Sequence, residues 1–156
     1  MASLKATITE SAILLPWLNE LKQYAAVPDD SRDQMLSHLL RTAILKVQEY
    51  ADAAVVECTV TQTTHVLDGT VVWLYLGGGV VESVTGKDGE PLPFLAKFDA
   101  VFLSYPYTGD VRVTYRTVPD VGDIQRLKPV VFRYATALFD GKDSSELGNI
   151  LNEALC

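Results

Sequence analysis

The chain has 156 residues, of which 48% are hydrophobic and 21% are charged, and its formal net charge is −7. These values are typical of a globular protein with a buried core, and they exclude an intrinsically disordered chain. The acidic balance argues against a basic surface that grips nucleic acid through its phosphates. It serves either solubility alone or a surface to which passing DNA does not adhere.

The cysteines and the N-terminal segment bear on the cellular compartment. Cys58 and Cys156 are the only cysteines, so neither a disulfide framework nor an oxidising compartment is indicated. The apolar run over 12–15 lies between Glu10 and Pro16 and is too short for a signal peptide. No stretch approaches the roughly twenty apolar residues of a membrane span. We therefore expect a soluble protein that is synthesised in the cytoplasm and has no membrane contact.

The first elements are expected to be a short strand and a helix. Residues 4–8 favour the strand, and Pro16 suits the first turn of a helix, where its missing N–H costs nothing. Trp17, Leu18 and Leu21 would then share an apolar face. The helix is expected to end near Val27-Pro28, because a residue before proline is disfavoured in the helical region.

The stretch from Asp29 to Ala54 predicts a long amphipathic helix. Ser31 followed by Gln34 fits a capping box, with Asp29 or Asp30 as the alternative cap. Apolar residues recur at helical spacing on one side, namely Leu36, Leu40, Ala43, Ile44, Val47 and Ala51. The other side carries Arg41, Gln48, Glu49 and Asp52. Leu39 and Tyr50 widen the apolar stripe, which therefore serves either the core alone or the core and a subunit contact.

A period of two takes over in the middle of the chain and predicts strands. The expected strands are 57–66, 70–76, 80–84, 98–105 and 111–116. Asp68-Gly69 predicts a hairpin turn, and further turns are expected at 86–89 and 108–109. Pro91 and Pro93 make the segment between them irregular or an edge. Tight turns between such strands indicate an antiparallel sheet or a small sandwich.

Two helical segments are expected to close the chain. Asp123 is the expected cap of the first, after the sheet ends at Val118-Pro119-Asp120. Pro129 lies within its apolar pattern and predicts either a kink or a helix that begins near Leu127. Asp140-Gly141 ends this helix. A last short helix is expected to begin with Ser144 or Ser145 as its cap.

The predicted fold class is α+β. An N-terminal helical hairpin is followed by an antiparallel sheet or small sandwich, and the C-terminal helices pack back on the N-terminal ones. We expect one domain over 1–156, with helical parts at about 12–54 and 120–156 and a β part at about 55–118.

No group of residues predicts an enzyme or a metal site. Gly77-Gly78-Gly79 is followed by neither a Gly-Lys-Ser/Thr motif nor a helix, which a phosphate-binding loop needs. His38 and His65 have no Cys or carboxylate at metal-ligand spacing. The acids at 29–30 and 120–123 lie at expected helix starts, where capping accounts for them. We expect no catalytic residue, no cofactor and no metal.

The aromatic residues suggest an alternative function. Trp73 and Tyr75 share one face of a predicted strand. Together with the glycine loop they suggest a ligand- or carbohydrate-binding β module. Core or interface packing explains the same residues, because large aromatic side chains dominate both.

The order of the elements, together with short motifs, resembles a known protein family. The segment Pro28-Asp29-Asp30-Ser31-Arg32-Asp33, with Leu36, Leu40, Ala43 and Glu49-Tyr50 after it, resembles the first helical hairpin of the tailed-bacteriophage head–tail connector (head completion or neck adaptor) family. In longer members strands follow, and then a Val-Pro-acid turn and a C-terminal helix, which Val118-Pro119-Asp120 and residues 124–139 resemble.

The resemblance implies a structural virion protein with no enzymatic activity. Such an adaptor assembles as a ring of about a dozen copies on the portal protein and meets a tail or stopper protein on its other side. DNA passes through the ring only as cargo. The protein would be synthesised in the host bacterial cytoplasm and reside in the virion neck.

A ring also implies partner contacts, because its interfaces join different patches of neighbouring subunits. The residues expected to contact neighbours or partners are Leu39, Val47, Tyr50, Gly77, Gly78, Gly79, Lys87, Asp88, Leu147, Ile150 and Leu151.

Overall fold

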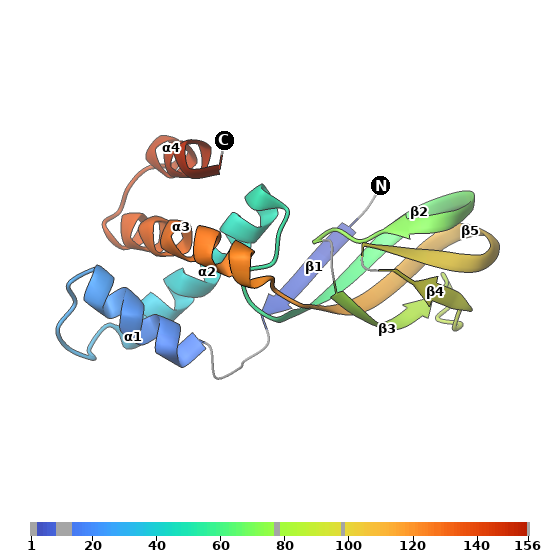
Figure 1. Ribbon diagram of the computed structural model, residues 1–156, viewed down its shortest axis with the longest axis horizontal. Helices are drawn as coiled ribbons and strands as arrows, with labels where there is room; N and C mark the ends of the chain where they lie inside the picture. Colours follow the sequence, from blue (N-terminus) through green and yellow to red (C-terminus); the bar gives the residue numbers. More distant parts are fainter. Residues whose placement is uncertain (1–2, 9–13, 77–78, 98, 156) are drawn as a thin grey trace. The chain divides into compact units, whose positions relative to one another are not determined.

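The computed structural model describes residues 3–8, 14–76, 79–97 and 99–155 (Figure 1). The chain divides into two compact units, one made of strands and one made of helices. The strands are β1 (Ser3–Ile8), β2 (Cys58–Trp73), β3 (Gly79–Thr85), β4 (Phe94–Ala96) and β5 (Ala100–Thr117). The helices are α1 (Leu14–Tyr24), α2 (Asp33–Ala51), α3 (Val121–Phe139) and α4 (Ser144–Leu155).

The predicted α+β class is confirmed. Helices precede and follow the sheet, and α3 packs against α1 and α2 while α4 packs against α2 and α3. The first strand, β1, pairs with β2 and so belongs to the sheet unit although it precedes the helices in the chain. The assignment of 1–156 to one domain stays a prediction.

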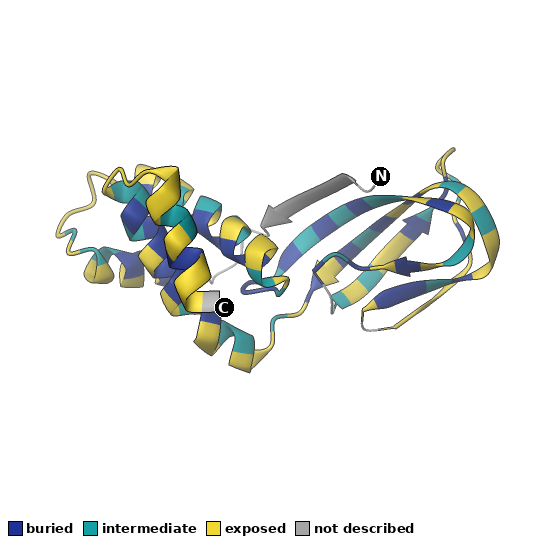
Figure 2. Cartoon of the chain, turned by 90° about the horizontal axis from the view of Figure 1, so that it is seen from above, coloured by how far each residue is buried: buried dark blue, intermediate teal, exposed yellow. Residues whose placement is uncertain are grey.

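The sheet is antiparallel, with strand order β1-β2-β5-β3, and β4 also pairs with β5. The long strands β2 and β5 pair along two stretches, Thr59–Val66 against Gly109–Arg116 and Val71–Trp73 against Ala100–Phe102. Buried and less buried residues alternate along the first stretch of β2, as the period of two predicts (Figure 2).

The predicted hairpin at Asp68-Gly69 is wrong, because β2 runs through these residues. The pairing with β5 shifts register on both sides of Gly69, which marks a β-bulge. Asp68 has φ 47°, and its N–H donates to Thr108 Oγ1 at 2.9 Å. Since β5 remains the partner before and after the bulge, the chain bends here and does not reverse.

The predicted turn at Thr108-Gly109 is wrong for the same reason. The strands expected at 98–105 and 111–116 are one strand, β5, in which Gly109 has φ 133° and pairs with Val66. The turn at 86–89 is confirmed, because Gly86 N donates to Glu90 O at 2.8 Å and Gly89 N donates to Gly86 O at 3.0 Å. The irregular segment around the prolines is also confirmed: Pro91 forms an isolated bridge and β4 is short.

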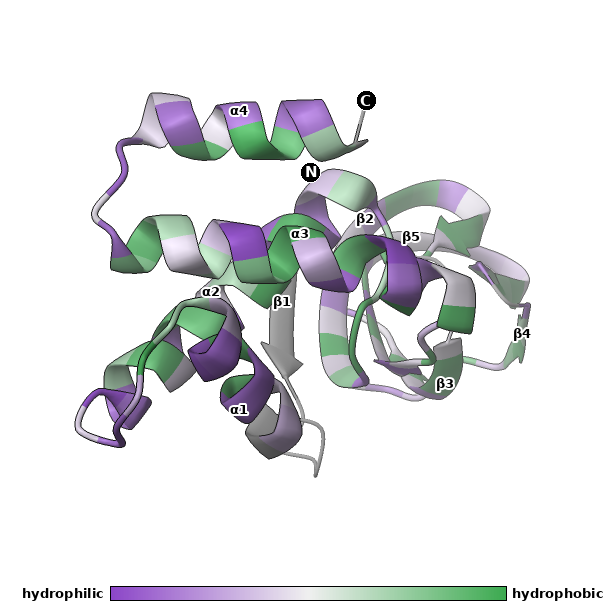
Figure 3. Cartoon of the chain, turned by 60° about the vertical axis from the view of Figure 1, so that its left-hand side comes forward, coloured by the Kyte–Doolittle hydropathy of each residue, from purple (hydrophilic) through white to green (hydrophobic). Residues whose placement is uncertain are grey.

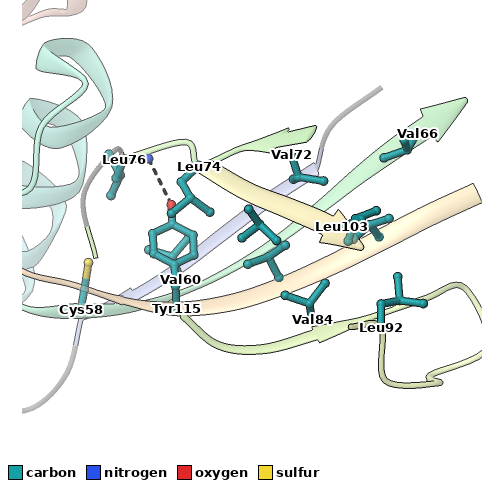
Figure 4. Close-up of a cluster of buried hydrophobic side chains, with 13 residues drawn as sticks. Cys58, Val60, Val66, Val72, Leu74, Leu76, Val84, Leu92, Leu103 and Tyr115 are labelled. Carbon is teal, nitrogen blue, oxygen red and sulfur yellow. Dashed lines mark hydrogen bonds between the residues drawn. The ribbon is translucent and has the colours of Figure 1, made fainter. Parts of the chain in front are cut away.

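The hydrophobic core of the sheet unit is a cluster of buried side chains that come mainly from β2 and β5 (Figure 4). Tyr115 is fully buried, and its hydroxyl accepts a hydrogen bond from Leu76 N at 3.1 Å. Gln62 is also buried. Its Nε2 donates to Trp73 O at 2.7 Å, and its Oε1 accepts from Tyr75 N at 2.9 Å. These bonds fix the chain at the end of β2, which stops at Trp73, three residues before the predicted end.

The helical unit buries the predicted apolar faces. Each helix is amphipathic, and the hydrophobic side of α4 faces α3 (Figure 3). The buried residues of α1 and α2 are Trp17, Leu18, Leu21, Leu36, Leu40, Ala43, Ile44, Val47 and Gln48. Those of α3 and α4 are Leu127, Val130, Val131, Phe132, Tyr134, Ala135, Ala137, Ile150 and Leu151.

The predicted capping of the long helix is wrong. Arg32 occupies the N-cap position of α2 and makes no capping side-chain hydrogen bond. Asp29 Oδ1 instead accepts from Ser31 N at 3.0 Å and from Ser31 Oγ at 2.6 Å. This Asx turn engages the serine hydroxyl that the capping box would have needed.

Gln48 was expected on the polar side of the helix, and this is wrong because it has no exposed surface. Its Oε1 accepts from Val55 N at 2.8 Å and from Val56 N at 3.3 Å. The end of α2 leaves these amides buried, and a buried amide needs an acceptor. Gln48 is therefore a core residue that stabilises the chain after the helix.

The caps of the C-terminal helices also differ from prediction. Asp120, and not Asp123, caps α3 and accepts from Gly122 N at 3.0 Å. The alternative start near Leu127 is wrong, because α3 continues through Pro129. For α4, Asp143 Oδ1 accepts from Glu146 N at 2.9 Å, so an aspartate serves where a serine was expected. In both cases the aspartate that directly precedes the helix accepts hydrogen bonds from its first free amides.

Candidate partner-contact surfaces

A groove of about 500 Å³ lies between the C-terminal end of α2, α3 and α4. It is lined by Lys46, Glu49, Tyr50, Tyr134, Ser144, Leu147, Gly148 and Leu151. Three predicted contact residues, Tyr50, Leu147 and Leu151, thus meet around one concave surface although about a hundred residues separate them in the chain. The groove has aromatic and aliphatic walls with one cation and one anion, a composition that suits an apolar side chain from a partner.

Helix α4 forms one wall of this groove and packs against α2 and α3. Ile150 and Leu151 are 8% exposed. Tyr50 Oη donates to Asn152 Oδ1, and Arg133 pairs with Glu153 at 2.9 Å. Gly148 lies on the same helix, and a Cβ added there would meet nothing within 4 Å. The glycine therefore keeps the groove wide at this point.

A second groove of about 360 Å³ also borders α4. It is lined by Tyr24, Arg133, Thr136, Ala137, Asp140, Lys142, Glu146, Asn149 and Ile150. Ile150, a predicted contact residue, belongs to this surface. Four of its lining residues are charged, and Lys142 pairs with Glu146 at 3.6 Å. Helix α4 thus borders this concave surface as well as the first.

The predicted contact residues Lys87 and Asp88 are exposed at the tip of the turn between β3 and β4. Tyr107 Oη accepts from Lys87 N at 2.9 Å and donates to Glu90 Oε1 at 2.8 Å. Glu90 Oε2 accepts from Asp88 N at 3.0 Å. The hydrogen bond from Tyr107 holds the pKa of Glu90 below its ordinary value. The two charged side chains are therefore presented on a well-fixed turn.

The remaining predicted contact residues have other positions. Leu39 is half-buried on α2, whereas Val47 is fully buried in the helical core. Gly79 is the first residue of β3 and pairs with Thr117, and a Cβ there would lie 2.5 Å from Arg116 O. This close approach explains the glycine without a partner. Gly77 and Gly78 lie outside the described residues.

The acids considered as catalytic candidates have structural partners. Asp30 pairs with Lys22. The hydrogen bond from the Ser31 hydroxyl holds the pKa of Asp29 below its ordinary value, so this group is no proton donor near neutral pH. Asp123 pairs with Arg126 at 3.3 Å. Capping was expected to account for all of them, and it does so for Asp120; ion pairs and an Asx turn account for the others.

The residues that the structure describes form neither a metal-binding cluster nor a membrane-spanning helix. In that part of the chain, no three His, Cys, Asp or Glu side chains come together as a possible metal site. His65 Nδ1 lies 3.0 Å from Asp110 Oδ1 across β2 and β5, as an exposed pair. None of the described helices is long and apolar enough to cross a membrane.

The sequence did not predict an exposed apolar surface on the sheet. Val71 and Trp73 of β2 lie on the outer face of the sheet beside Phe102 of β5 and Leu95 of β4. Trp73 is 65% exposed, so it is not a core residue. The alternation along β2 could have placed Val71 and Trp73 together. The pairing of β5 with both β2 and β4 could not be read from the chain, because it depends on long-range register.

Comparisons with known proteins identify the fold. No protein-family model matches the chain, and no curated protein matches it by sequence. A chain in the neck of an empty gene transfer agent particle, computed with C6 symmetry, aligns with a TM-score of 0.67 and 13% identity over 97% of this chain and 94% of that chain. A chain in the neck of the native particle, computed with C12 symmetry, aligns with a TM-score of 0.63 and 12% identity over the same shares.

A chain in the virion of the native gene transfer agent particle also aligns, with a TM-score of 0.57 and 12% identity over 90% of this chain and 84% of that chain. At such identities the likeness establishes the fold. It includes both the strands and the helices, because it spans nearly the whole chain. The resemblance to neck proteins that the sequence suggested is thus confirmed at the level of the fold.

Proposed function

We propose that this protein is a structural subunit of a head–tail neck, an adaptor that joins a capsid to a tail and has no enzymatic activity. The observation that carries the proposal is the correspondence with a neck chain over 97% of this chain and 94% of that chain. A shared module inside a larger, unrelated protein would leave much of one chain unmatched. Here the alignment spans nearly all of both chains.

We further propose that the subunits form a ring of about a dozen copies on a portal protein, with a tail or stopper protein on the other side. The neck structures of the matching chains were computed with C6 and C12 symmetry, which supports a ring. Each copy in a cyclic ring contacts its neighbours through different surfaces. The ring would be part of the virion, after synthesis of the subunits in the host bacterial cytoplasm.

The α2–α4 groove is the proposed site of a partner contact. Tyr50, Leu147 and Leu151 line it, and Leu39, which is half-buried on the same helix as Tyr50, is a proposed further contact on α2. Val47 is left out of this surface because its side chain is fully buried. Lys87 and Asp88 are a second proposed contact, because Tyr107 and Glu90 hold their turn in place before any partner binds. A preorganised turn lowers the entropic cost of binding.

The acidic charge fits the proposed passage of DNA. With a net charge of −7, the protein repels phosphate groups on average. A conduit that holds DNA only transiently benefits from such repulsion, since each Lys or Arg contact with a phosphate would add affinity.

Electron microscopy of the protein mixed with the portal of the same particle tests the proposal. We expect rings on one end of the portal. Leu147→Glu places a charge in the groove and is expected to reduce this decoration, whereas Met35→Glu, which places the same charge at an exposed apolar position of α2 outside the groove, is the matched control. Portals that stay bare at saturating wild-type protein would refute the proposed function. A monomer in the absence of portal is compatible with it.

The exposure of Trp73 keeps the carbohydrate-binding alternative open to a direct test. A sugar-binding platform needs hydrogen-bond groups beside the aromatic ring, because buried hydroxyls must be satisfied. The residues that share its face by strand register, Ala100 and Phe102 of β5 and Val71 of β2, are apolar. A glycan array is therefore expected to show no specific binding. Binding that Trp73→Ala removes would favour the alternative over the neck proposal.

A further inference from the structure

The outer face of the sheet carries a continuous line of apolar side chains on adjacent strands. Phe102 of β5 lies directly opposite Val71 of β2 on one side and Leu95 of β4 on the other. Trp73 follows Val71 by two residues and so points to the same face. We call Val71, Trp73, Leu95 and Phe102 the apolar row.

The apolar row faces away from the core. The residues between its members, Val72, Val101 and Leu103, are at most 6% exposed and belong to the core cluster, and Val72 and Leu103 are seen there in Figure 4. Within the row, Trp73 is 65% exposed, Leu95 is 61% exposed and Val71 is 38% exposed. Three large apolar side chains on a rigid sheet thus present their surface to solvent.

The backbone beneath the row is fixed on several sides. Gln62 holds the end of β2 through Trp73 O, and Leu74 N donates to Asp99 O at 2.9 Å. Ser104 N donates to Pro93 O at 3.0 Å, next to β4. Such a surface loses little conformational entropy when a partner covers it, which favours binding.

The chemistry of the row fits a protein partner. None of its members carries a charge, and depletion of charge with enrichment of aromatic residues marks the core of a protein interface. Lys97 and Asp99 are exposed nearby and supply a rim with both signs. A rim with both signs suits a partner surface of mixed charge, and the outer surface of this chain also mixes both signs.

The size of the row points to one contact among several. Large aromatic side chains bury about 150–250 Å² each, so the exposed part of the row amounts to roughly 300–400 Å². A stable pair of proteins buries about 800 Å² per partner. The row is therefore too small to hold an isolated dimer. It fits a proposed ring, in which each subunit contacts two neighbouring copies and the portal, so that no single contact has to hold the assembly alone.

We infer that the apolar row contacts the adjacent copy of this chain in the ring. This inference rests on the proposed function and names a surface for its subunit contact. Because ring contacts are heterologous, the row meets a different surface of the neighbouring copy. The free protein is then a monomer that associates weakly as its concentration rises.

Trp73 provides a direct probe of this contact. It is exposed, whereas Trp17, the other tryptophan, is 6% exposed, so acrylamide quenches mainly Trp73 in the monomer. We expect quenching to fall as protein concentration rises, in parallel with the increase in mass measured by sedimentation. Leu95→Ser is expected to weaken this association by about tenfold, a typical effect of truncating a central interface residue.

Leu67→Ser is the matched control. Leu67 is 80% exposed and also lies on the sheet, but outside the row. Its replacement is expected to leave association within about twofold of the wild type. Equal effects of the two substitutions would overturn the inference. Protection of Trp73 that does not depend on protein concentration would also overturn it, because the row would then be covered within one copy.

A photo-crosslinker at position 95 gives an independent readout on the assembled particle. Crosslinks between copies of this chain on decorated portals support the inference, and crosslinks to the portal or a tail protein refute it. If rings form and Leu95→Ser leaves them unchanged, the inference fails while the proposed function stands. If portals stay bare, the proposed function fails, and the quenching experiment on the free protein still decides whether the row binds a second copy.

Discussion

Gln48 permits a quantitative prediction about the helical unit. Its side chain is fully buried, and its Oε1 accepts hydrogen bonds from Val55 N at 2.8 Å and Val56 N at 3.3 Å. Gln48→Leu keeps most of the side-chain volume and removes the acceptor. A buried amide left without a partner costs about 1–3 kcal/mol. Since the second bond is long, we expect the free energy of unfolding to fall by about 2–4 kcal/mol.

Urea unfolding followed by the fluorescence of Trp17 measures this change in the helical unit. A Trp73→Phe background leaves Trp17 as the single tryptophan, and Trp73 belongs to the sheet unit. Gln34→Leu, on an exposed position of the same helix, is the control and is expected to change stability by less than about 0.5 kcal/mol. If Gln48→Leu is as mild as this control, the two amides do not depend on Gln48 and the reasoning is refuted.

Two further predictions concern the candidate contact surfaces. Gly148→Ala is expected to raise the free energy of unfolding by up to about 1 kcal/mol, because alanine favours a helix and the added Cβ has open space. A lower thermal midpoint would contradict this. The hydrogen bond from Tyr107 lowers the pKa of Glu90 in the folded protein below its ordinary value of 4.5. The ionised Glu90 carboxylate therefore stabilises the turn fully above pH 4.5, and this stabilisation is lost as the pH falls through the lowered pKa. The protection factor of the Lys87 amide, which is its intrinsic exchange rate divided by the observed rate at the same pH, should therefore fall in acid. Glu90→Gln should remove this pH dependence, and identical profiles for the two proteins would disprove the role of Glu90.

Much of the fold was predictable because it depends on local periodicity. The apolar faces of α1 and α2 were identified from helical spacing, and Leu21, Leu36, Leu40 and Ile44 are indeed buried. The alternation along β2 from Cys58 to Val66 was also read correctly. A buried face imposes its period on the sequence, so these features are visible without the tertiary structure. The candidate contact residues Tyr50, Leu147 and Leu151 were individually plausible for the same reason.

The bends and caps were not predictable in this way. Asp68-Gly69 has the composition of a hairpin turn, and it forms a bulge because β5 continues as a partner on both sides. Ser31 and Gln34 have the spacing of a capping box, but Asp29 engages the serine first. Gln48 is polar, and only the return of the chain past the helix end explains its burial. In each case several local structures fit the sequence, and a distant or competing hydrogen-bond partner selects one.

The sequence by itself determined that this is an α+β protein in which amphipathic helices come before and after the main strands of an antiparallel sheet along the chain, since burial of one face leaves a periodic pattern in the sequence. The tertiary structure alone decided which residues share a surface. Tyr50 and Leu147 meet at one groove because α4 packs beside the end of α2. Trp73 and Leu95 lie on one apolar row because β5 pairs with both of their strands. These contacts depend on strand register and on packing between distant segments, and neither can be predicted from local sequence.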